Sequence, residues 1–385
     1  MEYHSLLNDI SNVETPSFVI DIEKLNKNLK VLEGIKKRTS CKILLALKAF
    51  AMFKVFPLLR DKLNGVCASS QDEARLGREE FNKEVHTYCV AYSQSTMDSI
   101  LQYSDVVVFN SFHQWKRFRS LLNSKSGDNI SYGMRINPEH SEGKTPLYDP
   151  CTESSRLGVR IKDFDKNELK GISGFHFHTL CEHNSHALKR TLDAFEKSFS
   201  TYIYQLSWVN FGGGHHITRE DYDIELLCKL IENFKEKYQV DVYLEPGEAI
   251  VLNAGYFIAS ILDIISCDMP TVILDTSAAT HMPDVLEMPY RPHIIGSYAK
   301  GNASYSYRIC GISCLAGDII GEYSFNQPLK VGDKLIFTDM AHYTMVKTNT
   351  FNGIRLPSIF LYEPHKRSVK IVKKFSYNDY KMRLS

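Results

Sequence analysis

Three kinds of polar residue follow short apolar runs in this sequence, where each could carry chemistry. Lys48 closes the run 44–47, and a lysine delivered by an apolar strand can lose its proton and attack a carbonyl as a Schiff-base former. The alternative is a strand-end lysine whose ammonium group stays in solvent. His176 and His178 end a second run, and Glu245 ends a third. Reactive side chains of a βα barrel project from the C-terminal ends of its strands, so these positions are the first candidates for a site.

Histidine and cysteine are dense in one segment of the chain. It holds His176, His178, Cys181, His183 and His186, a cluster that invites a zinc site. The segment contains no paired CxxC and no HExxH arrangement, so we expect no metal there. Two alternatives remain, a histidine ring that lies flat on a planar cofactor and a hydrogen-bonded structural histidine.

A run of three glycines, Gly212, Gly213 and Gly214, follows the apolar segment 208–211. Successive glycines expose backbone N–H groups, which suits a phosphate cradle of the kind that barrels place after their late strands. A tight turn would use the same residues. The run is not a dinucleotide fingerprint, because GxGxxG with a downstream carboxylate is missing.

Two carboxylates follow the last apolar run, in the sequence Glu245-Pro246-Gly247-Glu248. Proline stiffens the chain there and fixes the direction of the carboxylates. A carboxylate opposite a pyridine nitrogen keeps that nitrogen protonated and the ring electron-withdrawing, which makes pyridoxal phosphate an electron sink. The alternative is a turn with solvated acids. A lysine, a histidine, a glycine cradle and a carboxylate on separate strands together meet the needs of that cofactor.

Alternating apolar runs and amphipathic stretches must position these residues, and this alternation is typical of βα units. The spacing Ser70 to Glu73 is that of a capping box, and Ser111 precedes a helical stretch over 112–122. Eight such units close a barrel. The eight predicted strands are 43–47, 65–68, 87–90, 105–109, 132–136, 174–177, 208–211 and 242–244.

The last third of the chain has a different pattern of apolar residues. Short strands are predicted at 272–274, 335–337 and 369–372, with few long helical periods and no flexible linker before them. The fold class is therefore α/β, a (β/α)8 TIM-like barrel with a second, C-terminal β-rich domain. We expect the barrel over 17–257 and the β-rich domain over 258–385, the latter joined by residues 1–16.

Composition excludes several classes of protein. The chain has 385 residues with 43% hydrophobic and 24% charged side chains, which is typical of an ordered globular enzyme. A formal net charge of +1 offers no overall attraction for nucleic acid or an anionic membrane, so we expect neither as a partner. The first residues do not form a secretory signal, and the nine cysteines form no disulfide framework. We therefore expect a cytoplasmic protein.

With these residues in view, the sequence resembles the pyridoxal-phosphate decarboxylases and racemases of the alanine racemase fold over nearly its whole length. More narrowly, it resembles carboxynorspermidine/carboxyspermidine decarboxylases. The segments that carry the resemblance are 46–49, 67–70 with Glu73, 174–182, 245–249, 281–292 and 314–318. The resemblance implies a barrel with a β domain, and a head-to-tail homodimer whose active sites include residues of the neighbouring subunit.

The resemblance also implies roles for individual residues. Lys48 would hold pyridoxal 5'-phosphate as a Schiff base, His178 would stack on the pyridine ring and Glu245 would pair with the ring nitrogen. Cys314 would reach in from the second subunit and help to protonate the carbanion left by carbon dioxide. The remaining cofactor-binding residues would be Gly212, Gly213, Gly214, Gly247 and, on the phosphate, Tyr343.

Two positions depart from the pattern of related ornithine and diaminopimelate decarboxylases. Glu248 stands where those enzymes carry an arginine, so one phosphate ligand is exchanged for an acid. Because cationic amines of a polyamine tail would meet a carboxylate through charge-assisted hydrogen bonds, we expect Glu248 and Asp284 to bind the substrate tail. The alternatives are a solvated Glu248 and an Asp284 that caps a local turn. The second departure is Thr280, where the family would have cysteine; its effect stays open, as do the roles of His281, Arg291 and Asp318.

The predicted function is decarboxylation of carboxynorspermidine or carboxyspermidine to norspermidine or spermidine. Three alternatives stand beside it. The first is a decarboxylase of a diamino acid such as diaminopimelate or ornithine, which would need to recognise a shorter tail. The second is a non-catalytic pyridoxal-phosphate carrier, which would resemble a barrel alone. The third is a zinc-dependent barrel hydrolase built on the histidine cluster. One methylene separates the two preferred substrates, and no motif reports such a difference.

Overall fold

The computed structural model describes residues 9, 10, 12–125, 130–143, 145–288 and 290–385. The chain divides into two compact units, and each is described by itself. The barrel unit comprises residues 28–250, and the sheet unit comprises 1–27 and 251–385.

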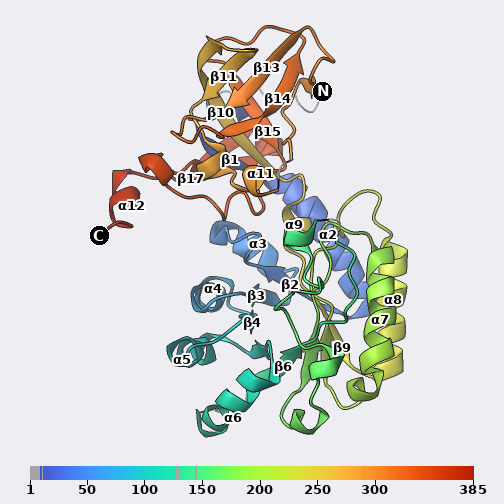
Figure 1. The fold of residues 1–385 in the computed structure, drawn as a ribbon. Helices are drawn as coiled ribbons and strands as arrows, with labels where there is room; N and C mark the ends of the chain where they lie inside the picture. The colour runs from blue at the N-terminus through green and yellow to red at the C-terminus, as the bar shows by residue number, and fades with distance from the viewer. Residues whose placement is uncertain (1–8, 11, 126–129, 144, 289) are drawn as a thin grey trace. The chain divides into compact units, whose positions relative to one another are not determined.

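The barrel unit is built on eight parallel strands that close on themselves within the described residues (Figure 1). Consecutive strands pair in chain order, and β9 closes the ring on β2 with Lys42 opposite Tyr243. Their short, almost continuous apolar runs are typical of strands buried on both faces. The strands are β2 (Lys42–Ala46), β3 (Gly65–Ala68), β4 (Glu84–Tyr88), β5 (Val106–Phe109), β6 (Ser131–Arg135), β7 (Gly174–His176), β8 (Trp208–Asn210) and β9 (Asp241–Leu244).

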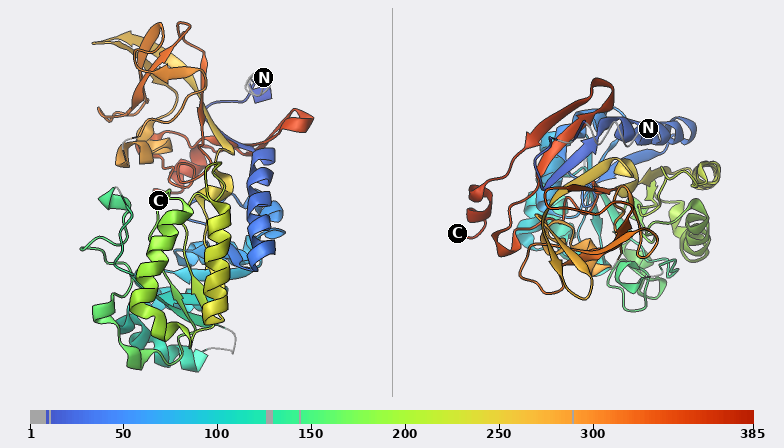
Figure 2. Two further views of the ribbon diagram at one scale, coloured as in Figure 1. Left: turned by 90° about the vertical axis from the view of Figure 1, so that its right-hand side faces the viewer. Right: turned by 90° about the horizontal axis from the view of Figure 1, so that it is seen from above.

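Helices follow most of these strands, and α7 and α8 lie side by side on one flank of the barrel (Figure 2). Side-chain caps define where several begin: Ser70 accepts the N–H of Glu73 at 3.1 Å before α4, and Asp223 accepts that of Leu226 at 2.8 Å before α8. The helices are α2 (Ile22–Thr39), α3 (Phe56–Arg60), α4 (Gln71–Leu76), α5 (Gln94–Tyr103), α6 (Phe112–Lys125), α7 (Ser185–Ile203), α8 (Ile224–Tyr238) and α9 (Glu248–Val251). Short helical turns add η1 (Phe53–Val55), η2 (Gly77–Phe81), η3 (Pro146–Tyr148), η4 (Ile161–Asp163) and η5 (Lys166–Glu168).

Aromatic and aliphatic side chains fill the barrel interior. The indole of Trp208 packs with Leu44, Val106 and Tyr243 and donates its Nε1–H to Ser131 Oγ at 3.0 Å. A Cβ atom on Gly174 of the neighbouring strand would overlap that indole ring. The interior is therefore a packed core rather than a channel, as in other barrels of eight strands.

The sheet unit holds a nine-stranded sheet in the order β12-β14-β13-β11-β10-β1-β16-β17, with β15 paired to β10. Its strands are β1 (Ser17–Asp21), β10 (Gly255–Ser266), β11 (Pro270–Leu274), β12 (Ser297–Ala299), β13 (Tyr305–Cys310), β14 (Ile319–Phe325), β15 (Lys334–Thr338), β16 (Ser358–Glu363) and β17 (Ser368–Lys373). Short helices are α10 (Ala278–His281), α11 (Asp284–Glu287), α12 (Tyr377–Lys381), η6 (Phe351–Gly353) and η7 (Pro364–Lys366). Strand β10 is long enough to contribute to two hydrophobic cores, with Phe257 and Ile261 in one and Tyr256 and Ile258 in the other.

The fold class is confirmed, and all eight predicted barrel strands are present. The observed units differ from the expected boundaries of 17–257 and 258–385. Strand β1 pairs with β10 and β16, so residues 17–27 lie in the sheet unit, as do 251–257. Of the expected joining segment, residues 9, 10 and 12–16 lie in the sheet unit, whereas 1–8 and 11 are outside the described residues. Within the described chain, no helix combines the length and apolarity that crossing a membrane requires.

Candidate active site

Four predicted site segments follow the C-terminal ends of barrel strands. Lys48 follows β2, His178 follows β7, the glycine run 212–214 follows β8 and Glu245 follows β9. Parallel strands of a closed barrel direct these ends to the same face, so the topology brings the four segments together.

Glu245 is the carboxylate at the centre of this face, and only 9% of it is exposed. Its Oε1 accepts a hydrogen bond from Asn210 Nδ2 at 2.7 Å, and its Oε2 lies 3.4 Å from His176 Nε2. The longer distance is that of an ion-pair contact rather than of a well-aligned hydrogen bond. Burial alone would raise the pKa of Glu245, but the neighbouring His176 and His178 outweigh it and the pKa is lowered. The carboxylate is therefore ionised, the state that a protonated ring nitrogen needs opposite it.

The two histidines on β7 and the following loop have different surroundings. His176 is 3% exposed, and neither of its ring nitrogens has a hydrogen-bond partner among the described residues. His178 accepts the backbone N–H of Gly213 at its Nδ1, at 3.0 Å. Burial and then the Lys48 charge lower the pKa of His178 well below its usual value, so its ring is neutral with the proton on Nε2. Loop 212–214 thus sets the tautomer of the ring that was expected to stack on the cofactor.

The glycine run is required by close packing of three strand ends. A Cβ on Gly212 would overlap the Phe177 carbonyl, one on Gly213 the Glu245 carbonyl and one on Gly214 the Leu180 carbonyl. The N–H of Gly212 already bonds Asn210 Oδ1 and that of Gly213 bonds His178. The phosphate cradle stays a prediction. Within the described chain, the N–H of Gly214 is the one in the run that donates no hydrogen bond, so it is the donor that a phosphate could use.

Lys48 is exposed at the mouth of the barrel. Its positive charge interacts with three neighbouring groups. It lowers the pKa of His178 further and opposes the rise that burial causes in the pKa of Glu73 and of Cys181. The chain around it is tied to the Glu245 turn: Ala46 N–H bonds the Pro246 carbonyl at 3.1 Å. Gly247 packs so closely on Ala46 and Ala49 that a Cβ there would overlap Ala49. Gly247 is therefore explained by packing, and its contact with the cofactor stays a prediction.

Glu248 lies beside a second histidine. Its Oε2 is 3.1 Å from His216 Nε2, with 17% of the Glu248 side chain and 9% of the His216 side chain exposed. The turn that holds His216 is tied to α9 by the Thr218 hydroxyl, which donates to the Ala249 carbonyl. Glu248 is therefore not solvated, and its binding of a substrate tail stays a prediction.

Cys314, Asp284 and Tyr343 lie in the sheet unit. Cys314 is exposed on the loop before β14, and its N–H donates to Asn352 Oδ1 at 2.7 Å. Asp284 Oδ2 accepts from the hydroxyls of Tyr290 at 3.1 Å and Thr344 at 3.3 Å, while its buried Oδ1 has no hydrogen-bond partner in the described chain. The parts played by these three residues in a site stay predictions.

The structure gives local roles to residues that the sequence left open. Asp318 accepts bonds from Ser313 and the Ala278 N–H, so it shapes the loop that carries Cys314. Arg291 lies over the Tyr323 ring at 4.5 Å and donates to the Glu322 carbonyl. His281 and Thr280 are fully buried; Nδ1 of His281 bonds the Thr276 hydroxyl at 2.8 Å. Thr280 belongs to the packed interior of this unit.

Three residues of the site were missed by sequence reasoning. Asn210, fully buried, links the glycine run to Glu245. Arg135 lies 4.6 Å over the Tyr88 ring and donates to the His178 carbonyl at 3.2 Å. All three end barrel strands, so the rule that predicted Lys48 and Glu245 would also have found them.

The predicted histidine cluster is divided by the structure. His176, His178 and Glu245 place one ligand atom each within 4.8 Å of one another, a spacing that could hold a metal ion. His183 lies apart from that set and bonds the Cys181 N–H and the Glu142 carbonyl. His186 lies apart as well, exposed beside Asp223. The same set contains Glu245, the carboxylate that a pyridine nitrogen would need, with the two histidines beside it.

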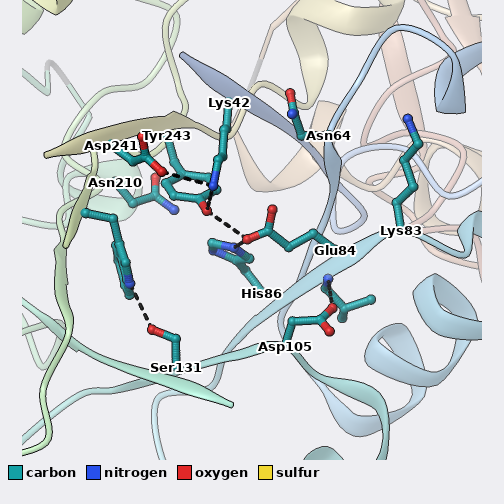
Figure 3. A network of polar contacts seen from close by, with 12 residues as sticks. Lys42, Asn64, Lys83, Glu84, His86, Asp105, Ser131, Asn210, Asp241 and Tyr243 are labelled. Carbon is teal, nitrogen blue, oxygen red and sulfur yellow. Dashed lines mark hydrogen bonds and ion pairs between the residues drawn. The ribbon is translucent and has the colours of Figure 1, made fainter. Parts of the chain in front are cut away.

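The opposite, N-terminal end of the barrel carries a cavity of about 370 Å³ that is lined in part by Glu84, Ser131, Trp208 and Tyr243. Figure 3 shows the polar network there, in which Tyr243 and His86 both contact Glu84 Oε1, at 2.8 and 2.9 Å. Charged groups at this end already pair with one another, as Arg78 does with Asp105. Residues at this end of a barrel usually contribute to stability, whereas active sites lie at the C-terminal end.

The C-terminal face fits pyridoxal phosphate. It offers an exposed amine at Lys48, an ionised and buried carboxylate at Glu245 and a histidine, His176, whose buried nitrogens make no hydrogen bond within the described residues. It also offers glycines at positions where side chains cannot be accommodated. A planar, charged ring with a phosphate tail is the kind of group that this set of donors can hold.

Comparisons with known proteins agree with this fit. Residues 18–341 match the family model described as "Pyridoxal-dependent decarboxylase, C-terminal sheet domain". A carboxynorspermidine/carboxyspermidine decarboxylase of Campylobacter jejuni is 42% identical over 96% of this chain and 98% of its own. A carboxyaminopropylagmatine decarboxylase of Synechocystis is also 42% identical, over 97% of this chain and 96% of its own.

A crystal structure of carboxynorspermidine decarboxylase from Campylobacter jejuni, complexed with norspermidine, has a TM-score of 0.89 to this chain at 40% identity. The likeness covers 96% of this chain and 100% of that one. Fold, site residues and full-length similarity lead to one assignment: this chain belongs to the pyridoxal-dependent decarboxylases.

Proposed function

We propose that this protein decarboxylates carboxynorspermidine or carboxyspermidine, or both, with pyridoxal phosphate as cofactor. The observation that carries the proposal is full-length similarity, at 42% identity, to an enzyme named for those substrates. The acidic side chain of Glu248 near the Lys48 face supports it, since a polyamine tail is cationic. The norspermidine in the similar crystal structure supports a site for such a tail.

The residues of the barrel would divide the work as follows. Pyridoxal phosphate supplies an electron sink for the bond to the departing carboxylate. Lys48 would hold the cofactor through its amine. Glu245, kept ionised and oriented by Asn210, would stabilise a proton on the pyridine nitrogen. His178, fixed as the neutral Nε2–H tautomer by Gly213, would lie against the ring as an uncharged surface.

We also propose that residues of the sheet unit act at the barrel face of a second copy of the chain. Cys314 is exposed in the single chain. A residue that acts in the site of a neighbouring subunit has to be exposed in this way before the subunits associate. There its thiol would help to return a proton to the carbon that lost the carboxylate. Tyr343 would bind the phosphate and Asp284 the tail. Active sites shared in this way require a homodimer.

The nine cysteines are free thiols, which favours a reducing compartment and hence the cytoplasm.

A second substrate class is favoured by one comparison. The relative named carboxyaminopropylagmatine decarboxylase is as similar to this chain as the first relative is. Agmatine ends in a guanidinium rather than an amine, and a carboxylate such as Glu248 can bind either group. The two classes therefore have to be separated by measurement.

The test is a visible spectrum of the purified protein followed by carbon dioxide release from five compounds. These are carboxynorspermidine, carboxyspermidine, carboxyaminopropylagmatine, diaminopimelate and ornithine. We expect a yellow protein that acts on the first two and far less on the others. Release from diaminopimelate or ornithine alone, or full turnover by a Lys48→Ala variant, would contradict the proposal.

A further inference from the structure

Strand β6 ends in a buried arginine, Arg135, of which only 6% is exposed. Its Nη2 donates to the His178 carbonyl at 3.2 Å, and its guanidinium lies 4.6 Å over the Tyr88 ring. Neither partner carries a negative charge, and within the described residues Arg135 forms no ion pair with a carboxylate. Because a buried cation without a counter-ion costs free energy, the surroundings of Arg135 favour an anionic ligand.

Two other arginines of the barrel unit are more exposed and nevertheless have acidic partners. Arg78 pairs with Asp105 at 2.6 Å, and Arg119 pairs with Glu168 at 2.7 Å. The side chains of these two arginines are 33% and 40% exposed, so solvent already stabilises their charges. Arg135 combines deeper burial with the absence of an acidic partner in the described part of the chain.

Direct contacts connect Arg135 to the residues that we propose to hold the cofactor. The carbonyl that it binds belongs to His178, whose ring is expected to stack on the pyridine. The Tyr88 ring beneath the guanidinium packs edge-on against His176, with the ring centroids 5.7 Å apart. Nε2 of His176 lies 3.4 Å from Glu245 Oε2. Arg135 therefore belongs to the same face of the barrel, one tyrosine and one histidine away from the carboxylate.

The order of the strands indicates which part of the cofactor the arginine meets. Strand β7, which precedes His178, pairs with β6 on one side and with β8 on the other. The glycine run 212–214, whose predicted ligand is the phosphate, follows β8, whereas Arg135 ends β6. In pyridoxal phosphate, the phosphate arm and the phenolic oxygen are on opposite edges of the ring. A ring that lies on His178 with its phosphate toward β8 would therefore direct its phenolic oxygen toward β6.

We propose that Arg135 is a cofactor-binding residue that holds the ionised phenolic oxygen of pyridoxal phosphate through a charge-assisted hydrogen bond. This inference rests on the proposed placement of the cofactor and extends it. A guanidinium has several N–H donors in a fixed fork, and one donor of Arg135 already binds the His178 carbonyl. The same side chain then contacts the edge of the ring and the segment that carries the stacking histidine.

The test measures the binding of two cofactors to the cofactor-free protein by equilibrium dialysis. One is pyridoxal phosphate, and the other is 3-deoxypyridoxal 5'-phosphate, which has a hydrogen in place of the phenolic hydroxyl. Arg135→Met removes the charge and keeps much of the side-chain length. We expect this variant to bind pyridoxal phosphate about tenfold to a hundredfold more weakly, as for loss of a charge-assisted hydrogen bond. Its affinity for the analogue should not fall, because the analogue offers no oxygen there.

The visible absorption band of the bound cofactor gives a second readout, which needs no substrate. A cation beside the phenolic oxygen favours the ionised form of that oxygen. Removal of the cation in Arg135→Met should therefore move the pH-dependent change of the band to higher pH. Arg135→Lys keeps the charge and should reverse most of this shift, although it lacks the fork of donors. Arg135→Gln is neutral as well, and it takes the place of Arg135→Met if that protein does not fold.

Two reference variants complete the design. Arg119→Met is the matched control, because Arg119 is 40% exposed and has its own partner in Glu168. It should bind both cofactors as the wild type does. His178→Ala should weaken the binding of both cofactors alike, since stacking on the ring does not depend on the phenolic hydroxyl.

Equal losses of affinity for both cofactors in Arg135→Met, or no loss for either, would overturn the inference. Unchanged affinities together with a raised KM for the substrate would also overturn it, because Arg135 would then bind the substrate carboxylate. Failure of the proposed cofactor placement looks different: His178→Ala would leave both affinities unchanged.

Discussion

Glu245 illustrates how a buried acid is kept charged by its neighbours. Its carboxylate has one oxygen bonded to Asn210 and the other near His176, and its pKa is lowered in spite of burial. A group whose pKa is lower in the folded state stabilises the fold above its unfolded value of about 4.3 and loses that contribution as pH falls through its folded value. Part of the free energy of unfolding of the wild-type protein therefore depends on Glu245 being ionised.

We predict that Glu245→Gln changes the pH dependence of stability of the cofactor-free protein. The melting temperatures of wild type and variant should differ by a constant amount near neutral pH. Below about pH 4 the wild type should lose stability more steeply, because its carboxylate takes up a proton that the amide cannot. Thermal unfolding measured by circular dichroism between neutral and acidic pH checks this. Parallel curves over the whole range would count against an ionised Glu245.

A second prediction concerns Gly213, whose N–H sets the tautomer of His178. In Gly213→Ala the new methyl group would overlap the Glu245 carbonyl, so the loop must move. A displacement of this size at a site can cost about a hundredfold in kcat/KM. The control is Gly34→Ala, because a Cβ at Gly34 of α2 meets nothing within 4 Å. Similar steady-state rates for the two variants would show that the loop tolerates the shift.

At the scale of elements, the strands β6, β7 and β8 depend on one large side chain fitting beside two small ones. Trp208 of β8 occupies space that a Cβ on Gly174 of β7 or on Gly133 of β6 would enter. The three residues are buried on strands that pair directly. Alternation of bulky and minimal side chains is what lets the interior of a small barrel close without voids.

We predict that Gly174→Ala lowers the free energy of unfolding by about 1–3 kcal/mol, the usual cost of overpacking a core. The double variant Gly174→Ala with Trp208→Phe should regain part of that loss, since a smaller ring makes room for the methyl group. Urea denaturation of the single and double variants measures this coupling. If Trp208→Phe brings no recovery, strain lies elsewhere in the strands.

Strand β4 is where the prediction of an element was least accurate. The sequence predicts a strand at 87–90, whereas β4 runs Glu84–Tyr88. Its first residues include Glu84 and His86, which are polar and therefore hide the strand pattern, yet His86 is 2% exposed. Figure 3 shows the reason: Glu84, His86 and Tyr243 contact one another inside the barrel and satisfy much of their polarity there.

At the scale of the whole molecule, the proposed site residues divide between two units. The barrel unit carries Lys48 and the sheet unit carries Cys314. If two chains share sites as proposed, a chain that lacks Lys48 still carries an intact Cys314, and a chain that lacks Cys314 still carries an intact Lys48. Such variants complement each other when their subunits mix.

We predict that Lys48→Ala and Cys314→Ala, each nearly inactive alone, regain activity when they are mixed and allowed to exchange subunits. Random exchange should restore about a quarter of wild-type activity, since half of the dimers are mixed and each has one intact site. Carbon dioxide release from the mixture measures this, and sedimentation at several concentrations establishes the dimer. A mixture no more active than its components would place both residues in one chain's site, or exclude Cys314 from it.

Local pattern in the sequence was enough for the barrel strands and for the positions of the proposed site residues at their C-terminal ends. Lys48, His178 and Glu245 end apolar runs, and the topology then brings strand ends to one face whatever the details of packing. The domain boundary could not be derived in this way, because β1 lies far in the sequence from β10 and β16, with which it pairs.

Tertiary structure alone decided which polar groups meet. Asn210 and Glu245 are 35 residues apart, and His216 and Glu248 come from different strand ends, yet each pair is in contact. It also decided that the glycine run serves packing and the orientation of His178 as well as any phosphate. Spacing along the chain reports local geometry, whereas a hydrogen bond between distant segments depends on how the strands close.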